Sequence, residues 1–486
     1  MSVKVIRRPE TLVPDDDRVI ARYFDLHSRR RVRALLSRIM RLSDEQVSQL
    51  LPRTMASFSS RHRDIRAVLL DNYEAVARYG RLHSEPSDGR RLLIGAYFTM
   101  EYSIESAALF NPSIVRHPDQ SELSGGQVRF LMSLRATGEG HVSSIVFRRG
   151  VLSAQGEIAF DPPPRFAYCA RAIPRSSFDK PPFVTRLRNL GVPEEVVAGV
   201  LAGLPDRFSL EQLQRAVEEV NHSSSASEGF NIALADILWS ARASYELHYP
   251  EECRPSEIVI FPATERERRG MEDLRLVCFR DEGAGVRYYG TYTAFDGFRT
   301  LPMMIETSDF TDFQVSPLRG RYARNKGLAL FPRKVGGRYV MVSRHDGENL
   351  HILTSDNVHV WNEGSRLYGP TEPWELVQVG NCGSPLETEA GWLLLTHGVG
   401  PLREYCIGAL LLDRDQPSRV LGRLREPLLI PAVSERGGYV PNVVYSCGSM
   451  IHRDRLIIPY ALSDSRTAFA SVAVSELLDT LRDSSA

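Results

Sequence analysis

Short runs of apolar residues, separated by polar turns, fill the chain from about residue 93 to its C-terminal end. Within the runs, aromatic and β-branched residues alternate with polar ones, as in VRYYGTYTAF and RYVMVSRH. Gly, Asp and Pro bound most of the runs. This alternation is typical of β-strands, since successive side chains of a strand point to opposite faces. The pattern therefore predicts a mainly β fold.

The runs recur in groups along the chain, which suggests a radially repeated architecture. A β-propeller repeats sheets of about four strands around a centre and leaves only short, protected edges. The runs available here suffice for about five such sheets, so we expect a five-bladed β-propeller. A β-sandwich or a double barrel would give a similar alternation. The pattern alone leaves these alternatives open.

Two segments depart from the strand pattern and show apolar residues at helical spacing. We expect an N-terminal helical extension over residues 1–92 and a helical insertion over about 181–247. The insertion interrupts a β domain of residues 93–480, and residues 481–486 form a C-terminal tail. The N-terminal helices are rich in arginine, which is typical of a solvated face or a subunit contact. If the protein forms a homo-oligomer, we expect these helices to mediate it.

Two capping boxes mark where helices should begin. Ser43 precedes Gln46 by three residues, and Ser209 precedes Gln212 by the same spacing. In a capping box the serine hydroxyl accepts a hydrogen bond from the third residue's backbone N–H, and that residue's side chain returns the contact. The sequence therefore predicts helices that start just after each serine.

Composition and charge exclude several classes of partner. The 486 residues include 60 Lys and Arg and 60 Asp and Glu, so the net charge is zero. A neutral chain argues against charge-driven attachment to nucleic acid or to a membrane surface. No apolar run is long enough to span a bilayer, and the N-terminus lacks an apolar targeting segment. We expect a soluble cytoplasmic protein.

The six cysteines and the absent motifs narrow the chemistry further. The cysteines lie far apart with no CxxC pair, so we expect reduced thiols and no metal centre. The sequence also has no Walker A loop, GxSxG, HExxH or dinucleotide fingerprint. We expect no cofactor.

Polar residues interrupt the apolar runs at several separate points. In a propeller such residues face a central channel, where they can converge on a ligand. Acids, cations and imidazoles from different strands would suit a polyhydroxylated or anionic ligand. The residues are Asn111, Arg135, Glu272, Asp273, Arg275, Lys326, Arg344, His345, His397 and Asp464.

Seven ordered blocks of the sequence resemble glycoside hydrolase family 130. They are FNPSIV, FLMSLRA, GMEDLRLV, NKGLALFPRKVGGRYVMVSRHD, GNCGSPLETEAGWLLLTHGV, YCIGALLLDRDQPSRVLGRLREPLL and YVPNVVYSCGSM, and they extend over roughly residues 95 to 480. The resemblance implies a five-bladed β-propeller that acts on β-mannosides. Most of the family are inverting phosphorylases that release mannose 1-phosphate, and a minority are hydrolases of β-1,2-linked mannosides. The expected ligands are therefore a β-manno-oligosaccharide and inorganic phosphate as co-substrate.

The resemblance also implies roles for individual residues. Asp273 matches the general acid of the family's Glu-Asp-Pro-Arg motif, whose proton reaches the glycosidic oxygen through a sugar hydroxyl. Asn111 and Arg135 match groups that hold the sugar, and we expect Glu272, Arg275 and Asp464 to bind substrate as well. Lys326 and His397 match further positions of the family. Two positions depart from the family's pattern: Leu274 stands where a proline is usual, and Thr396 stands where a tyrosine is usual.

The attacking group differs between the two reactions, and each needs different residues. Phosphate is already an anion, so a phosphorylase needs cations to hold it, and Lys326, Arg344, His345 and His397 are the candidates. A hydrolase needs a carboxylate that activates water on the face opposite the acid. Glu387 or Glu389 would then be the base. We prefer phosphorolysis, with an inverting β-1,2-mannosidase and a non-catalytic carbohydrate-binding propeller as alternatives.

Overall fold

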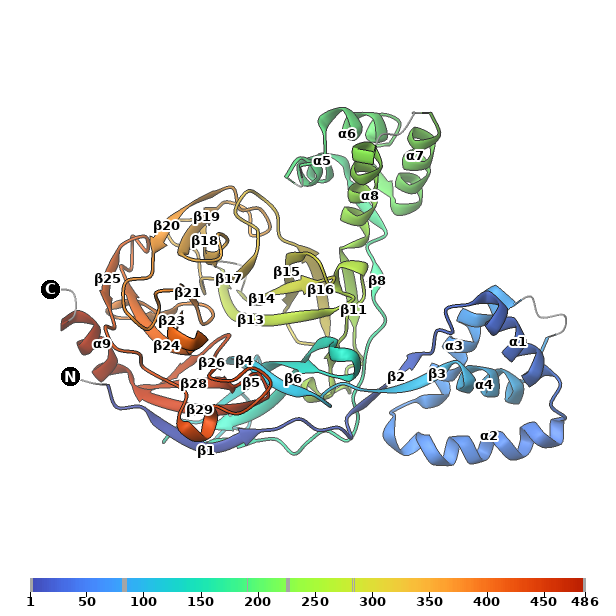
Figure 1. The fold of residues 1–486 in the computed structure, drawn as a ribbon, viewed down its shortest axis with the longest axis horizontal. Helices are drawn as coiled ribbons and strands as arrows, with labels where there is room; N and C mark the ends of the chain where they lie inside the picture. Colours follow the sequence, from blue (N-terminus) through green and yellow to red (C-terminus); the bar gives the residue numbers. More distant parts are fainter. Residues whose placement is uncertain are drawn as a thin grey trace.

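Strands account for most of the regular structure in the computed structural model, and the fold is mainly β (Figure 1). The structure describes residues 3–80, 85–189, 191–223, 228–281, 283 and 285–483. Within these residues, no helix is both long and apolar enough to cross a membrane.

Most strands of the main body form four sheets, of 11, 4, 5 and 5 strands, and neighbouring strands within a sheet are mostly antiparallel. The 11-stranded sheet is described below in two parts, groups 1 and 2, which are joined by one parallel pair, Ser143 with Gly270; groups 3, 4 and 5 are the other three sheets. Group 1 consists of β4 (Ala108–Arg116), β5 (Val128–Thr137) and β6 (Ser143–Leu152), with the short β7 (Ile158–Phe160) and β12 (Val259–Ile260) beside β6. Group 2 consists of β13 (Gly270–Asp281), β14 (Gly285–Phe295), β15 (Thr300–Thr307) and β16 (Asp312–Pro317), extended by β11 (Tyr245–His248) and β8 (Ile173–Pro174).

The remaining three groups complete the main body. Group 3 consists of β17 (Lys326–Leu330), β18 (Tyr339–Arg344), β19 (Leu350–Ser355) and β20 (Glu363–Tyr368). Group 4 consists of β21 (Gln378–Asn381), β22 (Leu386–Thr388), β23 (Gly391–Val399), β24 (Tyr405–Leu412) and β25 (Val420–Arg423). Group 5 consists of β26 (Val444–Tyr445), β27 (Met450–His452), β28 (Arg455–Leu462) and β29 (Arg466–Ala473). The groups follow one another in chain order around the middle of the main body (Figure 1).

The first strand of the chain belongs to the last group. β1 (Ile6–Leu12) pairs antiparallel with β29, so the two ends of the chain meet in one sheet. β2 (Val19–Tyr23) pairs with β3 (Thr99–Ser103) in a two-stranded ribbon. The prediction of a helical extension over residues 1–92 is therefore wrong for its first part. The sequence of β1 does not indicate that it pairs with β29, because this pairing depends on where the last strand group lies in the folded chain.

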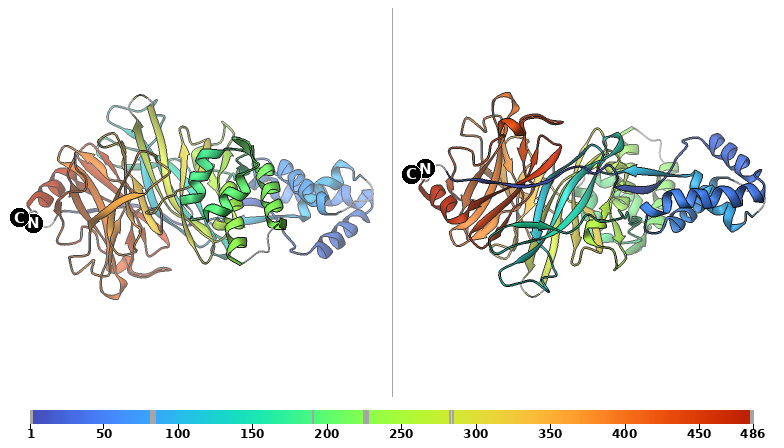
Figure 2. Two further views of the ribbon diagram at one scale, coloured as in Figure 1. Left: turned by 90° about the horizontal axis from the view of Figure 1, so that it is seen from above. Right: turned by 90° about the horizontal axis from the view of Figure 1, so that it is seen from below.

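The helices of the N-terminal region form a separate lobe. They are α1 (Arg29–Met40), α2 (Asp44–Phe58), α3 (Ile65–Gly80) and α4 (Asp88–Tyr97). The predicted capping box at α2 is present, with Ser43 Oγ accepting from Gln46 N and Gln46 Oε1 accepting from Ser43 N. Both views of Figure 2 put this lobe at the end of the molecule opposite the two termini.

The insertion forms a second helical lobe with its own apolar core. Its helices are α5 (Lys180–Asn189), α6 (Glu194–Leu201), α7 (Leu210–Ser223) and α8 (Glu228–Arg242), with the short strands β9 (Ser177–Asp179) and β10 (Arg207–Ser209). Phe178, Phe183 and Phe208 pack in the core, which shares no residue with those of the sheets. The predicted capping box between Ser209 and Gln212 is present at the start of α7.

A short helix ends the described chain. α9 (Val474–Asp483) packs its Leu477 and Leu481 into the apolar core between groups 4 and 5. The predicted C-terminal tail of residues 481–486 is therefore wrong for residues 481–483, and residues 484–486 lie outside the described residues. The helix was missed because strand alternation continues up to its first residue.

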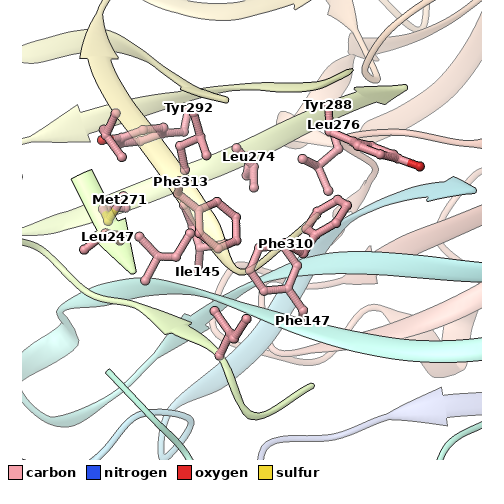
Figure 3. Packing of buried hydrophobic residues seen from close by; sticks show 14 of the residues in the cluster. Ile145, Phe147, Leu247, Met271, Leu274, Leu276, Tyr288, Tyr292, Phe310 and Phe313 are labelled. Carbon is pink, nitrogen blue, oxygen red and sulfur yellow. The ribbon is translucent and has the colours of Figure 1, made fainter. Parts of the chain in front are cut away.

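An aromatic-rich cluster supports the sheet that carries the candidate acid. Phe147, Phe310 and Phe313 pack edge-to-face or stacked with centroids about 6 Å apart, beside Leu274 on β13 (Figure 3). Leu274 is 3% exposed. The residue that replaces the family's usual proline is therefore a core residue, and its side chain stabilises the strand directly behind Asp273.

Candidate active site

Two polar residues on adjoining groups lie at β-bulges. The pairing of β4 with β5 shifts register between Phe110 and Ser113, and the pairing of β13 with β14 shifts between Glu272 and Arg275. The extra residues leave Asn111 at φ 50° and Asp273 at φ 59°, both in the left-handed region. A bulge bends the strand and re-aims a side chain that regular alternation would direct elsewhere. Such a backbone conformation costs energy and is typical of functional sites.

Bulges or left-handed backbone conformations also occur at other positions around the site. β17 shifts register after Lys326, which lies between Asn325 at φ 61° and Gly327 at φ 81°. Asp464 has φ 51° and Arg403 has φ 58°. Lys326 is the first residue of β17, Arg403 precedes β24 and Asp464 follows β28, so the three belong to different groups. Local backbone strain at each point thus turns polar side chains toward one place.

These side chains meet in a cavity of about 190 Å³. Group 1 contributes two of its lining residues, group 2 one, group 3 two, and groups 4 and 5 the rest. The lining residues are Asn111, Arg135, Asp273, Lys326, Arg344, His397, Arg403, Tyr405, Val440, Val443, Tyr445 and Asp464. Most of the predicted site residues are therefore brought together by the fold.

A network of charged groups holds one wall of the cavity. Arg135 donates from Nη2 to Glu272 Oε1 at 2.9 Å and from Nη1 to Asp273 Oδ1 at 3.3 Å. Lys326 Nζ donates to Glu272 Oε2 at 2.6 Å, so both oxygens of Glu272 are occupied. Asn111 Nδ2 donates to Asp273 Oδ1 at 2.7 Å. Charge-assisted contacts of this kind give a rigid arrangement, because Arg135, Glu272 and Asp273 each have more than one partner.

Asp273 is ionised in this environment. Burial alone would raise the pKa of its carboxyl, but the positive charges of Arg135, Arg275 and Lys326 and the hydrogen bond from Asn111 lower it to about 2. Arg275 also donates from Nη1 to the backbone oxygen of Asp273 at 3.0 Å, which fixes the bulge. The site therefore presents Asp273 as a carboxylate surrounded by donors.

Another part of the lining carries a guanidinium and an imidazole with buried nitrogens that have no partner among the described residues. Arg344 Nε and Nη1 and His397 Nε2 are buried, and within the described ranges no acceptor lies within hydrogen-bond reach of them. Nδ1 of His397 contacts the backbone oxygen of Asn381 at 3.2 Å, which orients the ring. Burial and the charges of Arg344 and Arg275 hold the pKa of His397 well below its usual range. Buried donors are rarely left unsatisfied, so the Arg344 guanidinium is suited to an anionic ligand. The neutral His397 ring donates from Nδ1 to Asn381, so its Nε2 is an acceptor that suits a hydroxyl group of a ligand.

A second carboxyl faces the same cavity in a different state. Burial and the negative charge of Asp273 raise the pKa of Asp464 to about 6, against the opposing effect of Arg135 and Arg403. Two like charges close together cannot both ionise freely. Asp464 is thus the carboxyl of this site that titrates nearest to neutral pH.

Some predicted residues lie elsewhere. Glu272 and Arg275 do not line the cavity themselves but contact residues that do. Glu272 accepts hydrogen bonds from Arg135 and Lys326. Arg275 donates to the backbone oxygen of Asp273 and, from Nη2 at 2.6 Å, to the Tyr445 hydroxyl. His345 points away and packs against the rings of His351 and Tyr322, with centroids 4.0 and 4.8 Å away. Its neighbour Arg344 lines the cavity because successive side chains of a strand point to opposite faces.

The two proposed hydrolytic bases are not at the cavity. Glu387 forms an ion pair with Arg333, at 2.6 Å from Nη2, and a longer one with Arg414 at 3.4 Å. Glu389 is exposed in the turn after β22. Neither belongs to the lining residues that the described chain supplies, so the prediction of a base at these positions is wrong. Both residues are close to His397 in the sequence, but in the fold they lie on or just after β22 and do not line the cavity.

Sequence reasoning missed several residues that line the cavity. Tyr405 and Tyr445 flank the His397 ring, with centroids 6.0 and 4.8 Å away, and Arg403 lies in the turn before β24. The two tyrosines occur inside otherwise apolar blocks, which was an available signal. Arg403 carries no such signal, because a charged residue in a turn is ordinary.

Comparisons with known proteins agree on one family. A family sequence model described as β-1,4-mannooligosaccharide phosphorylase matches residues 214–483. A 1,2-β-oligomannan phosphorylase of Thermoanaerobacter sp. (strain X514) is 34% identical over 223 residues, which are 44% of this chain and 71% of that protein. A β-1,2-mannobiose phosphorylase of Listeria innocua serovar 6a is 28% identical over 270 residues, which are 53% of this chain and 73% of that protein.

A solved structure is also similar. The β-1,2-mannobiose phosphorylase from Listeria innocua in complex with β-1,2-mannobiose aligns with a TM-score of 0.48 and 17% identity, over 78% of this chain and 92% of that one. The family assignment does not depend on it, since the sequence match extends over more than half of this chain. With the relative at 34% identity matched over 71% of its length, this chain belongs to glycoside hydrolase family 130.

Proposed function

We propose that this protein is an inverting β-mannoside phosphorylase that releases mannose 1-phosphate. The observation that carries the proposal is the presence, in one cavity, of the Asp273 carboxylate and of unpartnered guanidinium nitrogens of Arg344. A phosphorylase needs an acid on one side of the sugar and an anion-binding wall on the other. The curated relatives named above are phosphorylases of β-linked mannosides, which agrees with this division.

Asp273 is the general acid in this proposal. A phosphate oxygen attacks C1 of the mannosyl group while the bond from C1 to the glycosidic oxygen breaks, and the proton of Asp273 goes to that oxygen, directly or through a sugar hydroxyl. Monohydrogen phosphate brings one proton, which returns to Asp273 as the phosphate ester forms. Asn111 and Arg135 orient the carboxyl throughout.

Asp273 binds a proton weakly in the free site, and in this proposal phosphate binding raises its pKa. Its pKa of about 2 reflects the cations around it, among them Lys326. Phosphate held by Arg344 and Lys326 neutralises part of that positive charge, and a nearby anion raises the pKa of a carboxyl. A bound anion therefore favours the protonated form of Asp273 that the reaction needs, and its absence favours the ionised form, which disfavours hydrolysis by water.

We also propose that the five strand groups are the blades of a five-bladed β-propeller. Two observations support it: the groups succeed one another in chain order, and β1 pairs with β29 in group 5. Propellers commonly close the ring by combining strands from the two ends of the chain in one sheet, which removes a free edge. The cavity then lies at one mouth of the central channel.

One observation favours a second candidate, an inverting hydrolase. Asp464 lines the cavity with a pKa of about 6, which suits a base that activates water near neutral pH. It would take the role that Glu387 and Glu389 cannot fill from their positions. The unpartnered guanidinium nitrogens of Arg344 bind no anion in that reaction, so phosphorolysis is the better account.

The experiment is a product analysis with β-1,2-, β-1,3- and β-1,4-mannobiose, each with and without inorganic phosphate. The proposal expects mannose 1-phosphate to form from at least one linkage, and only when phosphate is present. Equal turnover to mannose without phosphate would replace the proposal with the hydrolase. Binding of a mannobiose in calorimetry without any product would favour a carbohydrate-binding protein that has no activity.

The role of Asp273 is tested in the same assay. Asp273→Asn removes the proton donor and keeps the size of the side chain, so turnover should fall below detection. Circular dichroism and the thermal unfolding midpoint report whether the variant is folded. A folded variant that retains activity would overturn the assignment of the acid.

A further inference from the structure

A second, larger cavity lies at the other end of the strands that build the candidate active site. Its volume is about 570 Å³, and part of its lining comes from β4, β5 and β13, each of which also contributes a residue to the candidate active site. β4 has Asn111 near its start and Arg116 at its end, and β13 has Asp273 near its start and Arg280 near its end. At about 3.3 Å per residue, Asn111 and Arg116 are separated by about 17 Å.

The interior between the two cavities is closed. A Cβ at Gly448, which lines the second cavity, would clash with Ser113 Oγ. Ser113 is fully buried, and its hydroxyl accepts a hydrogen bond from Leu276 N at 3.0 Å. The second cavity is therefore a separate site rather than an extension of the first.

Four guanidinium groups converge on the second cavity from four different strand groups. Arg116 ends β4, Arg280 is on β13, Arg333 follows β17 and Arg453 follows β27. Glu387 lines the same cavity and supplies one negative charge, so the four arginines leave an excess of positive charge there, which attracts an anion. A few convergent polar groups in a well-formed cavity are typical of ligand sites.

Only one of the four arginines has a carboxylate partner in the described part of the chain. Arg333 is paired with Glu387, whose pKa is lowered mainly by its hydrogen bonds to Arg333. For Arg116, Arg280 and Arg453, no carboxylate oxygen of a described residue lies within 4.0 Å of a guanidinium nitrogen. Ser384 Oγ also lines the cavity, is buried, and lacks a partner among the described residues.

The rest of the lining is apolar. Leu276, Val277, Met450 and Ile451 form a wall against which the uncharged body of a ligand can pack. Guanidinium groups match the oxygens of phosphate in geometry and stay charged at every physiological pH. The volume suits a ligand of the size of a phosphorylated sugar, since small-molecule sites measure roughly 300–1,000 Å³.

We propose that this cavity is a binding site for a small phosphate-bearing molecule, distinct from the candidate active site. Arg116, Arg280 and Arg453 bind the phosphate group, Ser384 donates a hydrogen bond, and the apolar wall covers the rest of the ligand. The inference goes beyond the proposed function and does not require it, because none of these residues contributes to the cavity that holds Asp273.

The experiment is isothermal titration calorimetry of the whole protein with D-mannose 1-phosphate, and in parallel with inorganic phosphate and with D-mannose. Four proteins are compared: wild type, the double variant Arg280→Ala/Arg453→Ala, the single variant Arg344→Ala, and the combination of all three substitutions. A control, Arg30→Ala/Arg33→Ala on the exposed face of α1, removes the same charge far from either cavity.

The expected result is two sites for mannose 1-phosphate in wild type and in the α1 control. The double variant should lose one site, with affinity weakened at least about tenfold, because hydrogen bonds to charged groups are removed. Arg344→Ala should keep that site and lose the other. D-Mannose should not bind to the second cavity, since it lacks the phosphate group.

Two outcomes would overturn the inference. In the first, the Arg280→Ala/Arg453→Ala variant binds mannose 1-phosphate and phosphate as wild type does. In the second, Arg344→Ala abolishes all binding, which would mean that only one site exists. If Arg344→Ala changes nothing while the double variant loses its site, the phosphate role proposed for Arg344 fails and the second site stands.

Discussion

Asn111 donates a 2.7 Å hydrogen bond to Oδ1 of Asp273, and both residues have a left-handed backbone at bulges of different strand groups. The contact joins residues that are 162 positions apart in the chain. It holds the carboxyl in one orientation and stabilises its ionised form. The geometry of the acid therefore depends on two bulges acting together.

Asn111→Ala should reduce kcat by about 100-fold, because a displaced catalytic group loses most of its orientation. The substitution also removes a hydrogen bond to the charged form, so the pKa of Asp273 should rise. Steady-state kinetics at several pH values measure both effects.

The matched control is Asn72→Ala in the N-terminal lobe. Asn72 is also buried and donates a 2.7 Å hydrogen bond, in this case to Thr99 Oγ1. Both variants should lose a similar free energy of unfolding, about 1–2 kcal/mol. If Asn72→Ala reduces kcat as strongly, the effect of Asn111 is one of stability alone.

Arg344→Ala should raise the KM for phosphate by about 100-fold or more and change the KM for the mannoside little. The variant removes a charged donor that faces the anion, and truncation of such a contact costs about 2–5 kcal/mol. Initial rates over a matrix of phosphate and mannobiose concentrations separate the two constants. Arg344→Lys should recover part of the loss, since the charge returns without the second donor.

His345→Ala is the neighbouring control and tests a role that the sequence predicted. Its ring packs against His351 and Tyr322 outside the cavity, so the KM for phosphate should stay within about twofold of wild type. A large increase would show that His345 reaches the anion when the site is occupied.

Glu387→Gln should leave turnover within about twofold of wild type, because Glu387 is paired with Arg333 and does not line the active-site cavity. A hydrolase that used Glu387 as its base would lose about 100-fold or more in kcat. Rates with and without phosphate distinguish these cases. Asp464→Asn is assayed in parallel. Among the described residues, Asp464 supplies the other carboxyl group, besides that of Asp273, that lines the cavity.

Asp464→Asn should make the protein more stable than wild type at neutral pH. The pKa of Asp464 is raised from 3.8 to about 6, so the folded state holds its proton more tightly than the unfolded state does. Its stabilising contribution is present below pH 3.8 and is lost as pH rises through about 6. Asparagine cannot ionise, so the variant should gain about 2–3 kcal/mol over wild type between about pH 4 and pH 7.5.

Asp346→Asn is the control of opposite sign. Backbone N–H groups of Glu348 and Asn349 donate to Asp346, and although burial opposes them, the pKa of its carboxyl is lowered from 3.8 to about 2. Its contribution is present above pH 3.8 and is lost as pH falls through about 2, so the variant should be less stable at neutral pH. Urea unfolding of both variants at several pH values checks the signs, and equal slopes with pH would contradict the assignment for Asp464.

Local features of the chain were predictable because they depend on neighbouring residues. The strand alternation, the two helical segments and the capping boxes at Ser43 and Ser209 all follow from contacts within a few positions. The residues with unusual positions in apolar runs, such as Asn111, Asp273 and His397, were also visible in the sequence and line the cavity. β1 was missed because its partner, β29, comes from the far end of the chain, and α9 was missed because strand alternation continues up to its first residue.

By itself, then, the sequence determined the element types, the family and most of the polar groups that meet at the candidate acid. Only the tertiary structure decided which groups share a cavity. In the folded chain, Glu387 forms an ion pair with Arg333, and His345 packs against Tyr322 while its neighbour Arg344 lines the cavity. Arg403 and Tyr445 also line the cavity. The physical reason is that bulges and strand register set where a side chain points, and both depend on pairing with strands that are distant in sequence.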